Sequence, residues 1–152
     1  EVVDRVLDLF GVQAAESQVE VRRYLDPELP SILIDAETLE AAIVNLVKNA
    51  IESMPAGGTL TATTRLTKNS IALDLIDTGC GMGERTALNM FDAFYTTKNG
   101  GSGLGLPTAR KVVEAHGGRI SVQSVEGRGT KFTLEFPAPA RISTAKEDSL
   151  AR

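Results

Sequence analysis

The sequence predicts an α+β domain, a two-layer α/β sandwich in which helices cover one face of a mixed, mostly antiparallel sheet. Two pairs of alternating apolar segments joined by short polar turns predict two β-hairpins, at residues 59–77 and 119–136. Single helical patterns stand between the strands, as a sheet covered on one face requires. The chain has 152 residues, a length that suits a single domain with one core.

The first third of the chain is predicted to hold two helices and two strands. Apolar residues at helical spacing predict a helix over 1–15, and a strand is expected over 19–24. After the turn DPELP we expect a short second strand at 31–34. Asp35 is a suitable N-cap for a long helix that ends near Met54, where the sequence PAGG stops it.

The rest of the chain is predicted to hold both hairpins and a second main helix. Strands 59–66 and 71–77 are joined by the polar turn TKNS. A loop, TGCGMGE, and a short helix lead into a glycine-rich run and then a helix over 104–116, which two glycines end. Strands 119–124 and 131–136 form the second hairpin across VEGRG.

Composition excludes several classes of protein before any motif is considered. Hydrophobic residues make up 42% and charged residues 24%, the balance of a globular protein, and a net charge of −4 argues against a nucleic-acid partner. Cys80 and His116 are the single cysteine and histidine, so neither a disulfide framework nor a thiolate or histidine metal site is expected. No apolar run reaches the roughly 18 residues needed to cross a bilayer, and no direct membrane contact is expected.

The chain starts at Glu1 inside a helical pattern and without a Met. We therefore expect a fragment of a longer cytoplasmic protein, whose full length could be anchored to a membrane. Residues 1–137 are expected to form the folded domain, monomeric by itself. The polar tail at 138–152 is expected to be disordered.

The long helix carries two asparagines beside its apolar stripe. Asn45 and Asn49 are one turn apart on the same flank, and Lys48 is next to them. Carboxamide oxygens placed in this way can bind a divalent cation, and the lysine can meet a phosphate. The alternative is an ordinary solvated flank.

An aspartate ends the buried face of an apolar strand. In IALDLID the side chains alternate, so Asp77 shares a face with core residues and needs hydrogen-bond donors there. A purine amino group is one candidate, and the backbone amides of the following turn are another. Gly79 and Gly81 would permit the close approach of a flat ring or supply positive φ.

The run TTKNGGSGLGLPTARK does not match the standard phosphate-binding loops. The loop with GxxxxGK[ST] spacing needs lysine directly after its last glycine, but Lys98 precedes the glycines and Gly105 is followed by Leu106. The dinucleotide fingerprint, with glycines at i, i+2 and i+5, fails as well. What remains is a glycine-rich stretch before a helix start, where free N–H groups favour an anion. A mobile surface loop is the alternative.

Five segments in order resemble the catalytic, ATP-binding domain of sensor histidine kinases, in the wider superfamily of gyrase, the heat-shock chaperone and mismatch-repair ATPases. The resemblance covers residues 1–137 and implies the Bergerat fold. The motifs TTK and GLGL are shared with the nitrogen-regulation type of kinase. The segments are NLVKNAIESM (45–54), DTGCGM (77–82), FDAFYTTK (91–98), GGSGLGL (100–106) and GRGTKF (127–132).

The resemblance implies a role for each matching residue. Asn49 would bind Mg²⁺ that bridges the phosphates of ATP, with Asn45 beside it. Asp77 would accept the adenine amino group, and Thr130 would assist through water. Lys98, Lys48 and the amides of the glycine run would hold the phosphates under a mobile lid. The full set of implied ATP-binding positions also includes Gly79, Gly81, Met82, Phe94, Thr97, Gly101, Ser102, Gly103, Leu104, Gly105 and Leu106.

The same resemblance favours phosphotransfer over hydrolysis. Relatives that hydrolyse ATP carry a glutamate base where this chain has Asn45, and an amide cannot take a proton from water. A neutral imidazole needs no such base, so the expected reaction is transfer to a histidine. The catalytic candidates are Asn45 and Lys98. The alternatives are a non-catalytic ATP-sensing module and an anti-sigma-like protein serine kinase.

The acceptor histidine is expected on another domain. His116 lies in EAHGG and lacks the acidic neighbour of a phospho-acceptor motif, so we interpret it as a residue that bonds the last helix carbonyls. The implied partners are the dimerisation domain that carries the acceptor histidine and a downstream response regulator. The domain alone is not expected to autophosphorylate.

Overall fold

The computed structural model describes residues 1–92 and 105–138, and the tail at 139–152 lies outside them. The described part contains five strands in one sheet. The helices are α1 (Val2–Leu9), α2 (Gly11–Glu16), α3 (Ala36–Glu52), α4 (Glu84–Asn89) and α5 (Gly105–Ala115). The strands are β1 (Val19–Tyr24), β2 (Gly58–Leu66), β3 (Ser70–Asp77), β4 (Arg119–Val125) and β5 (Gly129–Pro137).

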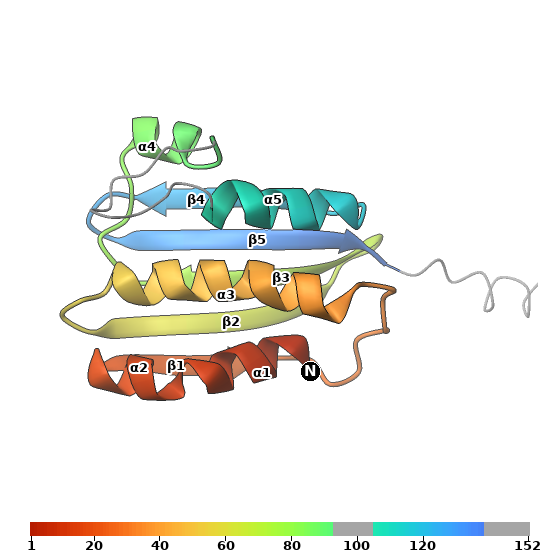
Figure 1. Ribbon diagram of the computed structural model, residues 1–152, viewed down its shortest axis with the longest axis horizontal. Helices are drawn as coiled ribbons and strands as arrows, with labels where there is room; N and C mark the ends of the chain where they lie inside the picture. The colour runs from red at the N-terminus through yellow and green to blue at the C-terminus, as the bar shows by residue number, and fades with distance from the viewer. Residues whose placement is uncertain (93–104, 139–152) are drawn as a thin grey trace, which may run out of the picture.

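The sheet has the order β1-β2-β3-β5-β4. β1 and β2 are parallel and are connected through α3, whereas the other three pairs of neighbours are antiparallel. Figure 1 shows α1, α2, α3 and α5 on one face of this sheet, with α4 beyond its β4 edge. The predicted mixed, mostly antiparallel α+β sandwich is therefore confirmed.

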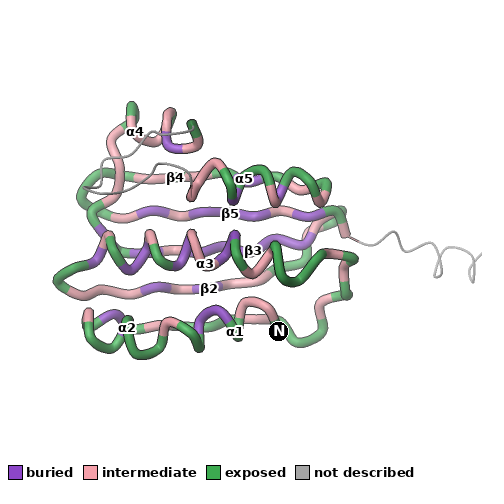
Figure 2. Tube along the Cα trace, in the orientation of Figure 1, coloured by how far each residue is buried: buried purple, intermediate pink, exposed green. Residues whose placement is uncertain are grey.

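Helix α3 packs on the sheet at the centre of the helical layer. Its sequence supplies an N-cap, which starts the helix, and an apolar stripe, which is buried against the strands. The Asp35 carboxylate accepts the Glu37 amide at 3.2 Å and satisfies one of the free N–H groups of the first turn. Figure 2 shows that buried positions recur along α3 and along the central strands β3 and β5. Packing of this stripe on the sheet forms the core. The buried residues of α3 are Ala42, Ile43, Leu46, Val47, Ala50 and Ile51.

Two predictions about the first third of the chain were wrong. The helix expected over 1–15 is two helices, because the backbone of Phe10 (φ −94°, ψ 4°) breaks the pattern just before Gly11. The strand expected at 31–34 does not form. Ile32 and Ile34 turn towards the core, but the segment lies against Phe136 at the end of β5 instead of pairing with a strand.

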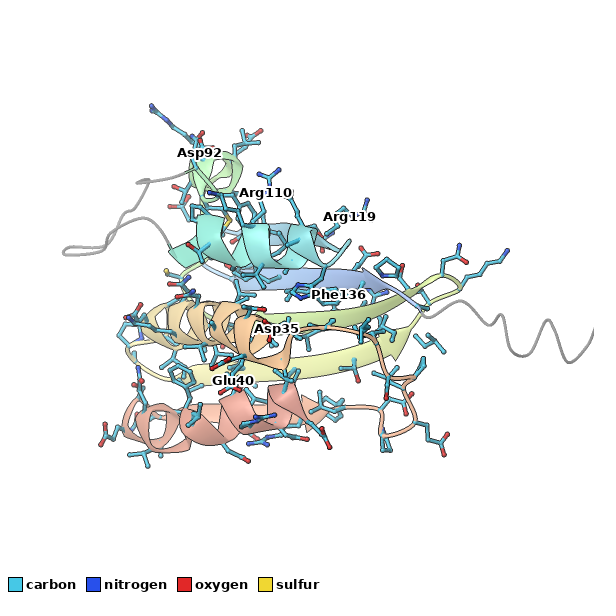
Figure 3. The ribbon with its side chains drawn as sticks, turned by 45° about the vertical axis from the view of Figure 1, so that its right-hand side comes forward. Asp35, Glu40, Asp92, Arg110, Arg119 and Phe136 are labelled. Carbon is cyan, nitrogen blue, oxygen red and sulfur yellow. The ribbon has the colours of Figure 1, made fainter. Side chains whose placement is uncertain are left out.

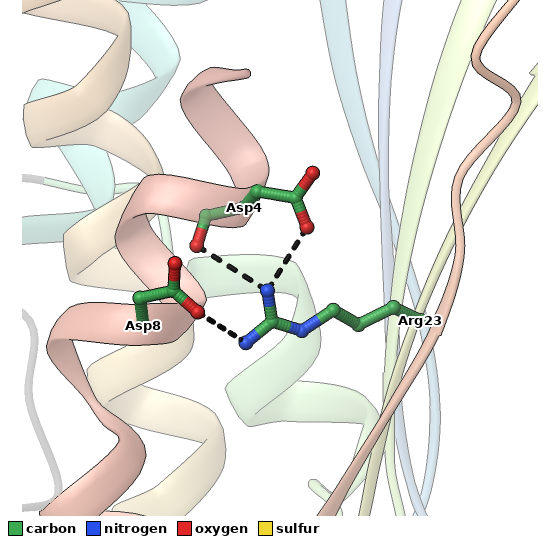
Figure 4. A network of polar contacts seen from close by, with 3 residues as sticks. All are labelled: Asp4, Asp8 and Arg23. Carbon is green, nitrogen blue, oxygen red and sulfur yellow. Dashed lines mark hydrogen bonds and ion pairs between the residues drawn. The ribbon is translucent and has the colours of Figure 1, made fainter.

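A polar network holds the first helix against the edge of the sheet. Arg23 of β1 donates to the carboxylates of Asp4 at 2.9 Å and Asp8 at 2.8 Å, one turn apart on α1 (Figure 4). These pairs lie at the surface, so they orient α1 more than they stabilise it.

Among the described residues, no helix is both long enough and apolar enough to cross a membrane.

Candidate nucleotide-binding site

Three polar side chains line up across β3, β5 and β4 on the face that the helices cover. Asp77 is paired with Thr130, and Thr130 with Ser124, so the three lie side by side in register. Asp77 is 5% exposed and Thr130 is 8% exposed. We call these three residues the polar row. Buried polar groups at one end of an otherwise apolar face need hydrogen-bond partners.

The carboxylate of Asp77 uses one oxygen for the protein. Its Oδ1 accepts the Gly79 amide at 2.9 Å and the Thr130 amide at 3.3 Å. The Ser53 hydroxyl lies 3.4 Å from the same oxygen and shares its one proton with the Ala50 carbonyl at 2.7 Å. Of the two kinds of donor considered for Asp77, the following turn supplies one, the Gly79 amide. No donor from the described residues bonds to Oδ2, which leaves an acceptor at the end of the core.

The surroundings of Asp77 oppose its ionisation. Burial raises the pKa of the Asp77 carboxyl, and the hydrogen bonds from Gly79, Thr130 and Ser53 offset this effect only in part. No Lys or Arg of the described residues forms an ion pair with it. A buried carboxyl that has a free oxygen and no cation is a candidate for ligand binding.

The turn after Asp77 is packed against the end of α3 and against β4. A side chain at Gly79 would collide with Ser53, whose carbonyl accepts the Cys80 amide at 3.1 Å. Gly81 has φ +67°, and a side chain there would collide with the Val125 carbonyl. The predicted positive φ is thus found at Gly81, whereas the lack of a side chain at Gly79 makes room for the C-cap of α3.

Ser124 connects the polar row to the same turn. Its hydroxyl oxygen accepts the Met82 amide at 2.8 Å and lies 2.8 Å from the Thr130 hydroxyl oxygen. The hydroxyl also donates to the Gly129 carbonyl at 3.0 Å. Met82 itself is half-buried and packs against the core. The turn and the polar row are therefore one hydrogen-bonded unit.

Asn45 of α3 faces the start of α5. The Asn45 carboxamide oxygen would lie 3.2 Å from a Cβ at Gly105, so these two predicted site residues are neighbours. Asn45 and Asn49 are half-buried, and Lys48 between them is exposed. Leu106 packs against the core just after Gly105. The flank of α3 that carries Asn45 therefore lies beside the first turn of α5.

The described residues contain no group of three or more His, Cys, Asp or Glu that could hold a metal ion. Carboxamides on one flank of α3 fit an ion such as Mg²⁺, which takes few protein ligands and keeps water and phosphate oxygens.

Part of the predicted site lies outside the described residues. It comprises Phe94, Thr97, Lys98, Gly101, Ser102, Gly103 and Leu104. Phe91, which precedes this segment in the sequence, packs edge-on against Phe132 with 6.4 Å between ring centroids. Arg110 of α5 stacks over Phe91 at 5.8 Å, and Figure 3 labels Arg110 on the outer side of that helix.

His116 lies at the opposite end of α5 from Gly105. Its Nδ1 is 2.8 Å from the Val112 carbonyl, and its Nε2 accepts the Asp35 amide at 3.2 Å, so Nδ1 carries the proton. Both ring nitrogens are therefore bonded, Nδ1 within α5 and Nε2 to the residue that caps α3. The interpretation of His116 as a structural residue at the helix end is confirmed.

Three residues that complete the site were not predicted as site residues, although Ser53 and Gly129 lie within two of the segments that carry the family resemblance. Ser53, Ser124 and Gly129 each contact the polar row, and a side chain at Gly129 would collide with the Asp77 carbonyl. These are single small residues, and they form no repeating pattern along the sequence that would mark them as site residues. Only the register of β4 with β5 and the C-cap of α3 bring them to Asp77.

The fold and the polar row define a two-layer α/β domain with a hydrogen-bond acceptor, Asp77 Oδ2, that no described residue fills, at the end of its central strands. This is the class of ATP-binding domain that the five sequence segments resemble. Residues 34–140 match the model of the Histidine kinase-, DNA gyrase B-, and HSP90-like ATPase family. Because this match covers more than half of the chain, the chain belongs to that family.

Curated relatives are named sensor and sporulation kinases. The chain is 35% identical over 149 residues to Sporulation kinase E of Bacillus subtilis (strain 168), covering 97% of this chain and 20% of that protein. It is 34% identical to the signal transduction histidine-protein kinase AtoS of Escherichia coli (strain K12), covering 90% of this chain and 22% of that protein. The chain therefore spans about a fifth of the length of these relatives.

Solved structures similar to the chain include catalytic domains of histidine kinases. The catalytic domain of histidine kinase ThkA superposes with a TM-score of 0.81 at 28% identity, covering 90% of this chain and 92% of that one. Full-length ShkA in complex with AMPPNP superposes with a TM-score of 0.78 at 30% identity, covering 91% of this chain and 30% of that one.

Proposed function

We propose that this domain binds Mg-ATP and donates the γ-phosphate to a histidine on a separate dimerisation domain, as the catalytic part of a two-component kinase. The observation that carries the proposal is the Asp77 carboxylate, whose Oδ1 is saturated and whose Oδ2 accepts nothing from the described residues. The AMPPNP complex of full-length ShkA supports a nucleotide as the ligand.

The base of the nucleotide is proposed to lie against the polar row. An exocyclic amino group is a donor and would complete the hydrogen bonding of Asp77 Oδ2. Gly81 and Met82 form the turn beside it, and Thr130 lies next to Asp77 on the same face. The free acceptor therefore favours adenine over a purine that has a carbonyl at this position.

The phosphates are proposed to lie between α3 and the start of α5. Asn49 would hold Mg²⁺, with Asn45 and the exposed Lys48 beside it, and the first turn of α5 would direct its N–H groups to the phosphates. Lys98 and residues 101–104 are proposed as phosphate contacts from the sequence alone. When bound, Mg²⁺ would neutralise charge on the phosphate oxygens.

Transfer to histidine is favoured over hydrolysis by the residue at position 45. The Asn45 carboxamide lies at Gly105 and supplies no base that could activate water. His116 is an unsuitable acceptor because both of its ring nitrogens are bonded within the domain. The acceptor is accordingly proposed to lie on a partner domain, and a response regulator would receive the phosphate from it.

The test is to mix the domain with the dimerisation domain of its own protein and labelled ATP. Acid-labile phosphate should appear on the partner and not on this domain. Asn49→Ala should abolish the transfer and weaken Mg-ATP binding, measured by calorimetry. Nucleotide binding without transfer would favour an ATP-sensing module, and acid-stable phosphate on a serine would favour a serine kinase.

A further inference from the structure

The hydroxyl of Ser124 has one proton and two lone pairs, and its three contacts use all of them. The Gly129 carbonyl at 3.0 Å is an acceptor only, so it takes the Ser124 proton. The Met82 amide at 2.8 Å is a donor only and fills one lone pair. One lone pair therefore remains for the Thr130 hydroxyl oxygen at 2.8 Å.

This count fixes the direction of the hydrogen bond between the two hydroxyls. If Ser124 donated to Thr130, its oxygen would face the Gly129 carbonyl with no proton between them, two acceptors at 3.0 Å. The favourable arrangement has Thr130 donating to Ser124. The Thr130 proton is then consumed inside the protein, and only lone pairs of its oxygen are left for a ligand.

We propose that Ser124 is a specificity-determining positioning residue, which makes the polar row present acceptors alone to a bound base. This inference rests on the proposed function, since it names the chemistry of the same site. Thr130 neighbours Asp77 on one face of the sheet, so the Thr130 oxygen and Asp77 Oδ2 act together. A base with an amino group matches both atoms, whereas a base with a carbonyl there meets two acceptors.

Removing the Ser124 hydroxyl should release the Thr130 proton. In Ser124→Ala the Thr130 hydroxyl can rotate and donate to a carbonyl of the base, directly or through one water. ADP carries a 6-amino group and inosine diphosphate a 6-carbonyl group, so the two nucleotides report this change. We expect the ratio of ADP affinity to inosine diphosphate affinity to fall roughly three- to tenfold, the effect of one net hydrogen bond.

The experiment is calorimetric titration of both nucleotides against the wild type and Ser124→Ala, after thermal unfolding has shown that the variant folds. A purely structural role would weaken both nucleotides by one factor and leave their ratio unchanged. Ser121→Ala is the matched control, because Ser121 is an exposed serine of the same strand on the opposite face. Ser124→Cys, whose thiol bonds weakly, is the second variant with the same expected direction.

The outcomes separate this inference from the proposed function. A wild type that binds neither nucleotide contradicts the proposed function itself. A wild type that prefers ADP, with an unchanged ratio in Ser124→Ala and Ser124→Cys, overturns only the role of Ser124. In a Thr130→Val background, Ser124→Ala should no longer alter the ratio, and a change there would show that Ser124 does not act through Thr130.

Discussion

Strand β3 carries two buried carboxylates that point to opposite faces of the sheet. Asp74 accepts the Thr133 hydroxyl at 2.6 Å on one oxygen and Nε of Arg65 at 2.9 Å on the other. Asp77, on the helix-covered face, has its donors from the described residues on one oxygen, and no cation among those residues pairs with it. The two groups are similarly buried, at 4% and 5% exposure, so burial does not distinguish them.

The difference between the two aspartates lies in whether both oxygens are satisfied. Burial alone would raise the pKa of Asp74, but the hydrogen bonds from Arg65 and Thr133 outweigh it and the pKa lies below its ordinary value. The pKa of Asp77 is raised, since its amide and hydroxyl donors do not compensate for burial. We infer that Asp74 serves the stability of the sheet, whereas Asp77 retains an acceptor for a ligand.

The largest effect expected from this comparison is on nucleotide affinity. Asp77→Asn should weaken ADP binding by roughly 10- to 150-fold, because a hydrogen bond to a charged acceptor is lost. The free energy of unfolding should stay the same or rise, since the amide oxygen can still accept the Gly79 amide and no buried charge remains. Calorimetry and urea unfolding measure the two quantities. Unchanged affinity would contradict the assignment of Asp77.

Asp74→Asn is the matched variant on the same strand, and its effects should be the reverse. We expect the free energy of unfolding to fall by about 1–2 kcal/mol, because the new amide group faces Arg65 as a second donor. ADP affinity should be unchanged, since Asp74 lies on the opposite face of the sheet. A loss of affinity equal to that of Asp77→Asn would remove the distinction between the two carboxylates.

The sequence predicted the hairpins and the burial of Asp77 because both follow from alternation along a single segment. It was wrong about residues 31–34, since alternation reports which side chains are buried and not which backbone groups find a partner strand. It was silent about Ser53 and Ser124, and about the partners of Asp74. Those contacts depend on the register between strands and on a helix cap, which no single segment encodes.

The pH dependence of stability should have opposite signs for the two carboxylates. With its lowered pKa, Asp74 stabilises the fold above the pKa of an unfolded aspartate, about 3.9, and this stabilisation is lost as pH falls through the folded pKa. With its raised pKa, Asp77 imposes a cost that grows as pH rises from about 3.9 through the folded pKa.

Urea unfolding of the wild type and both variants between about pH 3 and pH 7 measures this contrast. The stability lost in Asp74→Asn should increase with pH, whereas the stability of Asp77→Asn relative to the wild type should rise with pH. Parallel curves for the two variants would show that their ionisation in the folded state is the same.

The smallest effect on the free energy of unfolding is expected for a substitution of Arg65, the cation beside Asp74. This substitution tests whether charge or hydrogen-bond geometry holds the Asp74 carboxylate. Arg65→Lys keeps the charge but loses the Nε–H donor, and the Arg65 side chain is 45% exposed, so water screens the pair. We expect a loss of about 0.5 kcal/mol in the free energy of unfolding, because the Thr133 hydroxyl still satisfies one oxygen of Asp74. Thr133→Val should cost more, since Thr133 is buried and its hydrogen bond is the shorter one. If Arg65→Lys proved the more damaging, the Nε–H hydrogen bond of Arg65 and not the buried hydroxyl would be what separates Asp74 from Asp77.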